Sequence, residues 1–209
     1  MANLKSMIDL KKPERDTHGQ STFSHVKWVC LAVSNDKLRG NLQYVLLDDG
    51  YFIASDSHRI HIYKSNYGKE FDGLYEISLF TGKRLILEKI EGTDFPDWRR
   101  TQNKMKDFTQ SLTLTGVKRG AEKGIVSLNT ASALILKALD YRSGINLHYL
   151  DDVLSSGHEY TVTIPAPDSN KIVLECTEED EWAALMPFKL VPSDTEQLAK
   201  AFEKSEVEA

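Results

Sequence analysis

A hairpin signal in the N-terminal half of the chain constrains its fold more than any other feature. Two apolar runs, residues 42–47 and 51–54, flank Asp48, Asp49 and Gly50. An Asp-Gly pair between apolar runs is a strong short-range signal for two antiparallel strands. Residues 59–64 then alternate isoleucine with polar or aromatic side chains, as in a strand with two different faces. The polar stretch 54–61 is therefore expected at a strand end, where recognition residues are commonly displayed.

Two segments have the apolar spacing of helices. Ser21 or Thr22 is the predicted N-cap of the first, which ends near residues 34–36. Its apolar stripe consists of Phe23, Val26, Val29, Cys30 and Val33, and Ser24, His25 and Lys27 fall outside it. Asn129 or Thr130 is the predicted N-cap of the second helix. The predicted inner face of that helix consists of Leu134, Ile135, Ala138 and Leu139.

Further strands are predicted along the rest of the chain. They cover residues 75–80, 84–90, 108–115, 125–128, 145–150, 160–164, 172–176 and 182–190. Residues 81–91 also suit one face of a helix, and this alternative remains open. Each half, about 20–100 and 101–192, thus has one helix followed by several antiparallel strands. The prediction is an α+β domain over residues 20–192, with two helices on one face of antiparallel sheets and internal pseudo-two-fold symmetry.

Both ends of the chain are predicted to lie outside this domain. Residues 1–19 contain little that can be buried, and we expect a flexible arm or a peripheral first turn. Residues 193–209 form an acidic tail that opens with the capping box Ser193-Asp-Thr-Glu196. Its apolar stripe is thin, so fraying is expected.

Composition excludes several classes of protein. The net charge of −5 argues against a protein that coats nucleic acid over its whole surface, although it permits a local basic face. No apolar run is long enough for a membrane span, and the N-terminus lacks the apolar core of a signal peptide. We therefore expect a cytoplasmic protein. Cys30 and Cys176 lie inside apolar patterns without metal-type spacing, which predicts buried thiols and neither a metal nor a cofactor.

Four segments resemble bacterial β sliding clamps, the processivity subunit of DNA polymerase III. Residues 54–60 (Ala-Ser-Asp-Ser-His-Arg-Ile) are similar to the family's Ala-Thr-Asp-Gly-His-Arg-Leu, and residues 95–100 (Phe-Pro-Asp-Trp-Arg-Arg) to its Phe-Pro-Asp-Tyr-Arg-Arg. Residues 186–190 (Met-Pro-Phe-Lys-Leu) are similar to its closing Met-Pro-Met-Arg-Leu. Residues 31–40 resemble a helix end and loop of the family. The resemblance implies a sliding-clamp fold in a shortened form, as in a phage clamp-like protein.

The resemblance also implies a pocket for the short peptides by which polymerases, clamp loaders and repair proteins bind a clamp. An apolar floor would hold the hydrophobic anchors of such a peptide, and polar groups at the rim would fix its register. The floor is assigned to Ile60, Pro96, Met186, Pro187, Phe188 and Leu190. The rim is assigned to Ser55, His58, Arg59, Arg100 and Lys189. Thr101 makes one wall more polar than in the family, and Ser57 replaces a glycine of the family's turn.

A clamp role implies double-stranded DNA, a DNA polymerase and a clamp loader as partners, with a homo-oligomeric ring as the assembly. Helices of a clamp line its hole, where Lys and Arg meet phosphates without reading the sequence. The candidate DNA-facing residues are Lys27, Lys37, Arg39, Lys118, Arg119, Lys123 and Lys137. Each of them also fits an ordinary solvated surface.

Two other functions remain open. The first is a monomeric adaptor or decoy that binds polymerase or clamp-loader peptides without encircling DNA. The second is a metal-dependent enzyme that uses Asp56, His58 and His61. No second carboxylate or histidine motif, phosphate loop or nucleophile elbow supports the enzyme, so we expect no catalysis.

Overall fold

The computed structural model describes residues 7–13, 21–91, 94–103, 108–115, 128–140, 143–165, 171–191, 193 and 197. The strands are β1 (Met7–Lys11), β2 (Val45–Asp48), β3 (Tyr51–Ser55), β4 (Arg59–Lys64), β5 (Gly73–Phe80), β6 (Arg84–Ile90), β7 (Phe108–Thr115), β8 (Ser143–Gly144), β9 (Glu159–Pro165), β10 (Ile172–Cys176), β11 (Glu181–Leu185) and β12 (Phe188–Lys189). The α-helices are α1 (Thr22–Cys30), α2 (Arg99–Asn103), α3 (Leu128–Ala138) and α4 (Leu147–Leu154). The short 3₁₀ helices are η2 (Lys37–Gln43), η3 (Lys69–Phe71) and η4 (Thr177–Glu179).

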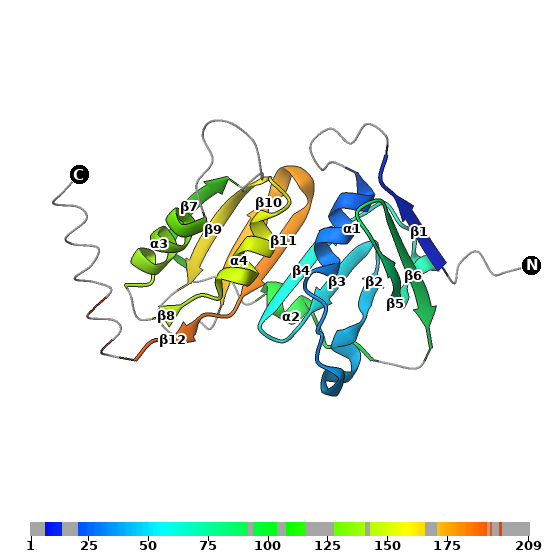
Figure 1. The fold of residues 1–209 in the computed structure, drawn as a ribbon, viewed down its shortest axis with the longest axis horizontal. Helices are drawn as coiled ribbons and strands as arrows, with labels where there is room; N and C mark the ends of the chain where they lie inside the picture. The colour runs from blue at the N-terminus through cyan, green and yellow to red at the C-terminus, as the bar shows by residue number, and fades with distance from the viewer. Residues whose placement is uncertain are drawn as a thin grey trace, which may run out of the picture.

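Ten of the described strands form one antiparallel sheet in the order β1-β6-β5-β2-β3-β4-β11-β10-β9-β7. The N-terminal half contributes the first six strands of this order, β1-β6-β5-β2-β3-β4, and the C-terminal half contributes the other four (Figure 1). The two halves meet where β4 pairs with β11, in a register that runs from Arg59 opposite Leu185 to Tyr63 opposite Glu181. A pair of very short strands, β8 and β12, forms a separate small sheet.

The predicted pseudo-symmetry is visible around the junction of β4 and β11. On one side α1 precedes the antiparallel run β2-β3-β4, and on the other α4 precedes the run β9-β10-β11. Because the order in the sheet is β2-β3-β4 followed by β11-β10-β9, the two runs mirror each other in sequence about the junction. The C-terminal half also contains α3, so it has two helices where we predicted one.

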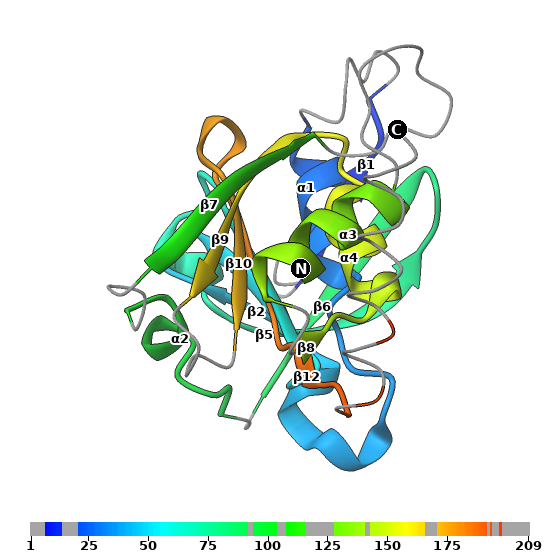
Figure 2. The same ribbon diagram turned by 90° about the vertical axis from the view of Figure 1, so that its left-hand side faces the viewer.

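The sheet has two apolar faces with different coverings. Helices α1, α3 and α4 lie on one face, and α2 lies on the opposite face (Figure 2). The large core lies under the three helices and includes Phe23, Val26, Leu150, Val153 and Ala183. On the other face a smaller cluster contains Ile53, Ile60, Ile62, Trp98, Val173, Trp182 and Ala184. Alternate residues of β4 therefore belong to different cores, as the pleat of a strand requires.

Local sequence signals explain several of these elements. Asp49 and Gly50 have φ values of 53° and 83°, which is the geometry of a tight hairpin turn and explains the Asp-Gly pair. Ser21 is the N-cap of α1, and its hydroxyl accepts a hydrogen bond from the amide of Ser24. Residues 84–90 form strand β6, so the strand prediction is confirmed over the helical alternative. No helix among the described residues is long and apolar enough to cross a membrane.

Other predictions for the elements were wrong. Residues 147–150, predicted as part of a strand, begin helix α4, whose N-cap Asn146 accepts from the amide of His148. Residues 7–11 form edge strand β1 against β6 instead of an arm, because Ile8 is buried there. Leu134, predicted on the inner face of the second helix, is 43% exposed, whereas Ile135 is buried as predicted and Ala131 is buried beside it. The predicted strand 125–128 lies outside the described residues except for Leu128, which begins α3, and the tail lies outside them except for residues 193 and 197.

Buried His61 predicts how stability depends on pH. Its ring stacks on Trp28 at 4.3 Å, and burial lowers the pKa of His61 from 6.5 to about 3. Between these values the unfolded chain takes up a proton that the folded chain does not, so stability is lost as the pH falls below about 6.5. His61→Phe keeps a stacked ring that cannot be protonated. In urea denaturation its unfolding free energy should fall by about 2 kcal/mol less than that of the wild type between pH 7 and pH 5. Equal decreases would contradict this prediction.

Candidate functional site

The segment that ends in β4 and the segment that follows β11 lie side by side. The amide of Met186 donates a 2.7 Å hydrogen bond to the carbonyl of His58, directly beyond the last strand pair of β4 and β11. His58 and Met186 are both exposed at this point. The first and third of the clamp-like segments are thus in direct contact.

The turn before β4 is held by its own side chains. Asp56 Oδ1 accepts hydrogen bonds from the amides of His58, at 2.9 Å, and Arg59, at 3.0 Å. The Ser55 hydroxyl donates to the Arg59 carbonyl at 2.8 Å. Ser57 has a φ of 76°, a left-handed conformation that favours glycine. Ser57 therefore strains this turn locally, where a glycine would adopt the same conformation without strain.

Arg59 is a buried structural residue, which corrects its assignment to the rim of a pocket. Its side chain is 6% exposed and forms ion pairs with Asp56, at 3.0 Å, and with Asp152 of α4. The guanidinium also donates to the Leu31 carbonyl and lies 4.4 Å from the centre of the Tyr149 ring. Because the charge is satisfied inside the protein, Arg59 joins the two halves and is not presented to a partner.

Residues 95–101 pack on the face of the sheet opposite α1. Trp98 is buried in the cluster that includes Ile60, its ring lies 5.2 Å from that of Tyr51, and its Nε1 donates to Asp48 Oδ2 at 2.9 Å. Pro96 and Arg100 are exposed, and Thr101 is half-buried. The second clamp-like segment therefore meets the first through Ile60. Ile60, assigned to the floor of the peptide pocket, is only 7% exposed and packs in this buried cluster.

The segment after β11 presents large apolar side chains to solvent. Met186 is 45% exposed, Phe188 is 51% exposed and Val191 is 56% exposed. The ring of Phe188 lies so close to Gly144 that an added Cβ would meet it at 2.4 Å. Pro187 and Leu190 are half-buried, and Lys189 is exposed. Exposed apolar residues that follow one another in this way are typical of surfaces that bind a partner.

The candidate partner surface is therefore defined by Ser57, His58, Met186 and Phe188. Arg39, predicted to face DNA, lies at its border: it donates to the carbonyl of Asp56 at 3.1 Å, and its Nη2 lies 3.4 Å from Nε2 of His58. The structure thus places a guanidinium beside His58. The assignment of a peptide pocket to these residues stays a prediction.

The other candidate DNA-facing residues are divided among several elements. Lys27 of α1 is half-buried, with its ammonium 5.4 Å from the centre of the Phe80 ring. Lys37 is exposed in η2, and Lys137 is exposed on α3. Helix α4 carries two aspartates and neither lysine nor arginine. Lys118, Arg119 and Lys123 lie outside the described residues. The candidate bases that the structure describes therefore lie on three different elements, α1, η2 and α3.

The residues proposed for a metal-dependent enzyme are not brought together. His61 is fully buried, and its Nδ1 lies 3.0 Å from the Trp28 carbonyl, whereas His58 is exposed and Asp56 caps the turn and pairs with Arg59. Among the described residues the group with suitable metal-binding geometry is a different one, His25, His158 and Glu179. His25 was predicted to lie off the buried face of α1, yet it is 3% exposed. No motif or residue spacing predicts this group, since its members are far apart in the chain.

Comparison with known proteins gives a fold. No family model matches the chain, and no curated protein matches it. The solved structure of the DNA polymerase III β subunit from Thermotoga maritima is similar, with a TM-score of 0.54 and 13% identity over 88% of this chain and 66% of that chain. The β subunit from Borrelia burgdorferi gives 0.53 and 13%, over 91% and 66% of the two chains. The sliding clamp from Caulobacter crescentus gives 0.51 and 15%, over 91% and 67%.

The fold is therefore the α+β fold of the bacterial DNA polymerase III β sliding clamps. The chain spans slightly less than two thirds of the length of the Thermotoga and Borrelia proteins. The predictions of an α+β protein and of a sliding-clamp fold are both confirmed. Phage origin, a shortened form and ring formation stay predictions.

Buried Arg59 predicts a large loss of stability on mutation. Arg59→Met should lower the free energy of unfolding by about 3–5 kcal/mol, because Asp56 and Asp152 would remain without their common cation. Arg84→Met is the matched control, since Arg84 makes a similar pair with Asp9 at the exposed edge of the sheet. Arg84→Met should lower the free energy of unfolding much less, because water screens an exposed ion pair. Urea denaturation measures both, and similar losses for the two variants would contradict the structural role of Arg59.

Proposed function

We propose that this protein is a sliding-clamp-like processivity factor that holds a DNA polymerase on its template by binding a short peptide of the polymerase. The observation that carries the proposal is the contact between the His58 turn and the segment after β11, on a sliding-clamp fold. Met186 and Phe188 supply exposed apolar contacts there, and His58 supplies a polar one. Methionine adapts its shape to different partners, which suits a surface used by several peptides.

The chemistry of such a role requires no catalysis. The protein would act by geometry, with one surface for the partner and another for DNA. Lys27 and Lys137 are the described bases on the helices that cover one face of the sheet, and Lys37 lies nearby in the chain on η2. Contacts of this kind neutralise phosphates without reading bases and weaken as salt increases. A clamp loader would be a further partner of the same apolar surface.

A closed assembly would require contacts between several chains. Within the described residues β1 and β7 are the two end strands of the sheet. Such edges offer unpaired backbone groups, and head-to-tail contacts between different surfaces produce rings when their rotation closes. We therefore propose a homo-oligomer joined through these edges.

Truncation of the apolar surface provides the test of peptide binding. The double variant Met186→Ala with Phe188→Ala should weaken binding of a polymerase C-terminal peptide by about 2–4 kcal/mol, because hot-spot side chains at the centre of an interface are lost. Isothermal titration calorimetry measures the affinity. Leu134→Ala is the control, since Leu134 is similarly exposed, at 43%, on α3. If the folded double variant bound the peptide as tightly as the wild type, the assignment of peptide binding to this surface would be wrong.

Solution mass separates the clamp from the monomeric adaptor. Sedimentation equilibrium at micromolar concentration should show a dimer or larger assembly, and the assembly should stay on circular DNA but slide off linear DNA. The adaptor would use the same apolar surface without forming an assembly. A chain that binds the peptide and remains a monomer would identify the adaptor.

A further inference from the structure

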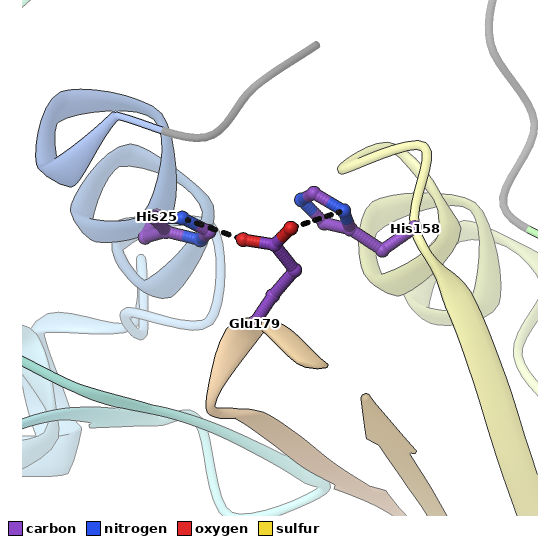
Figure 3. Close-up of side chains that lie close together, drawn as sticks. All are labelled: His25, His158 and Glu179. Carbon is purple, nitrogen blue, oxygen red and sulfur yellow. Dashed lines mark ion pairs between the residues drawn. The ribbon is translucent and has the colours of Figure 1, made fainter. Parts of the chain in front are cut away.

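Two histidines and a glutamate from three separate elements meet near the junction of the two halves. His25 lies on α1, His158 directly precedes β9, and Glu179 lies in η4 (Figure 3). His25 Nε2 is 3.5 Å from Glu179 Oε2, and His158 Nδ1 is 3.9 Å from Glu179 Oε1. One ligand atom from each residue lies within 4.8 Å of the other two. The carboxylate of Glu179 therefore lies between two imidazole rings.

A second carboxylate orients His25. Nδ1 of His25 lies 2.8 Å from Oε1 of Glu181, a residue that is 1% exposed. The other oxygen of Glu181 accepts from the hydroxyl of Tyr160. Glu181 thus holds Tyr160 with one oxygen and lies against Nδ1 of His25 with the other, while Nε2 of His25 faces Glu179. Histidines that bind a metal commonly have their second nitrogen fixed by a carboxylate in this way.

His158 gives an independent indication of a ligand. Its side chain is 9% exposed, and its Nε2 is buried without a hydrogen-bond partner. The nearby oxygen Oε1 of Glu181 is 4.0 Å away, too far for a hydrogen bond. A buried ring nitrogen without a partner costs free energy, and such groups in native proteins commonly mark a bound ion or a functional role. The His158 ring stacks with His25, with centroids 5.6 Å apart, so it is aimed into the same cluster.

We propose that His25, His158 and Glu179 bind one Zn²⁺ ion, with Glu181 orienting His25. Two imidazole nitrogens and a carboxylate oxygen form a ligand set that zinc accepts, whereas Mg²⁺ and Ca²⁺ prefer oxygen ligands alone. Zinc bonds of 2.0–2.1 Å in tetrahedral geometry place ligand atoms about 3.4 Å apart. The 3.5 Å separation of His25 and Glu179 already fits. A rotation of the His158 side chain that moves its ligand atom by about 1.4 Å closes the remaining gap, since the three ligand atoms lie within 4.8 Å of one another.

The ion has a structural role. The side chains of His25, His158 and Glu181 are at most 9% exposed, and Glu179 is 19% exposed, so the site has little contact with solvent. Its ligands come from α1 in the N-terminal half and from β9 and η4 in the C-terminal half. A bound ion would therefore link the halves above the pairing of β4 with β11, beside Tyr63, whose ring stacks on His25 at 4.4 Å.

The experiment uses the full chain, freed of metal with a chelator and then dialysed. Titration with zinc chloride at neutral pH should show one ion per chain. Zinc at a hundredfold excess over its Kd should raise the Tm by about 5–10 °C, whereas magnesium and calcium should leave it unchanged. His158→Gln should abolish the zinc-dependent rise, with the metal-free Tm of the same variant as its reference.

Two further variants complete the test. Glu179→Gln should also abolish the rise, and it decides the result if His158→Gln does not fold. His148→Gln should keep the full response, because His148 is 74% exposed on α4 and lies outside the cluster. The absence of stoichiometric zinc binding by the wild type would overturn the proposal. A zinc response in Glu179→Gln equal to that of the wild type would also overturn it. Peptide affinity is not part of this test, so its outcome is independent of the proposed clamp function.

Discussion

The antiparallel pairing of β4 with β11 is the interaction on which the rest of the structure depends. Five residue pairs, from Arg59 with Leu185 to Tyr63 with Glu181, make one sheet from the strands of two halves. Without this pairing each half would expose a new edge in the middle of the molecule. The hydrogen bond from Met186 to His58 continues the same ladder by one step. The strand pairing that joins the two halves of the sheet thus also brings together the two segments of the candidate partner surface.

Polar side chains on the helix side of β4 fix how this junction packs. Arg59, His61 and Tyr63 alternate with the isoleucines and face Asp152, the Trp28 carbonyl and His25, respectively. A shift of β4 by one residue would place the isoleucines under the helices and these polar groups on the other face. Because buried polar groups cost free energy unless they are paired, the shifted register is disfavoured. The inferred zinc site lies at the end of this row and adds a metal link to it.

Much of the fold could be predicted from local patterns. The alternation in residues 59–64, the Asp49–Gly50 turn and the cap at Ser21 each specify structure within a few residues, and the structure has them as predicted. Helix α4 was mistaken for a strand, although Asn146 followed by Leu147, Leu150 and Val153 has both a cap and helical spacing. Strand β1 was missed because its sequence has only a few apolar residues. It forms a strand by pairing with β6, which is far away in the chain.

The candidate site could be predicted only in part. Short motifs identified the His58 turn and the segment after β11, and the structure brings them together. The same motifs wrongly assigned Arg59 to a surface. Its partners, Asp152 and the Leu31 carbonyl, are far away in the chain, so the sequence does not show that they lie on the buried side of the strand. The group of His25, His158 and Glu179 depends entirely on tertiary contacts between distant elements. No periodicity or spacing of residues could have indicated it.

Amide hydrogen exchange with and without a polymerase C-terminal peptide tests the central claim most directly. That claim is that the turn before β4 and the segment after β11 form one surface for a partner. The account predicts that the peptide slows exchange of the His58 and Arg59 amides and of the Met186 and Phe188 amides together. Added protection in only one of these segments, or only at places remote from both, would contradict the account.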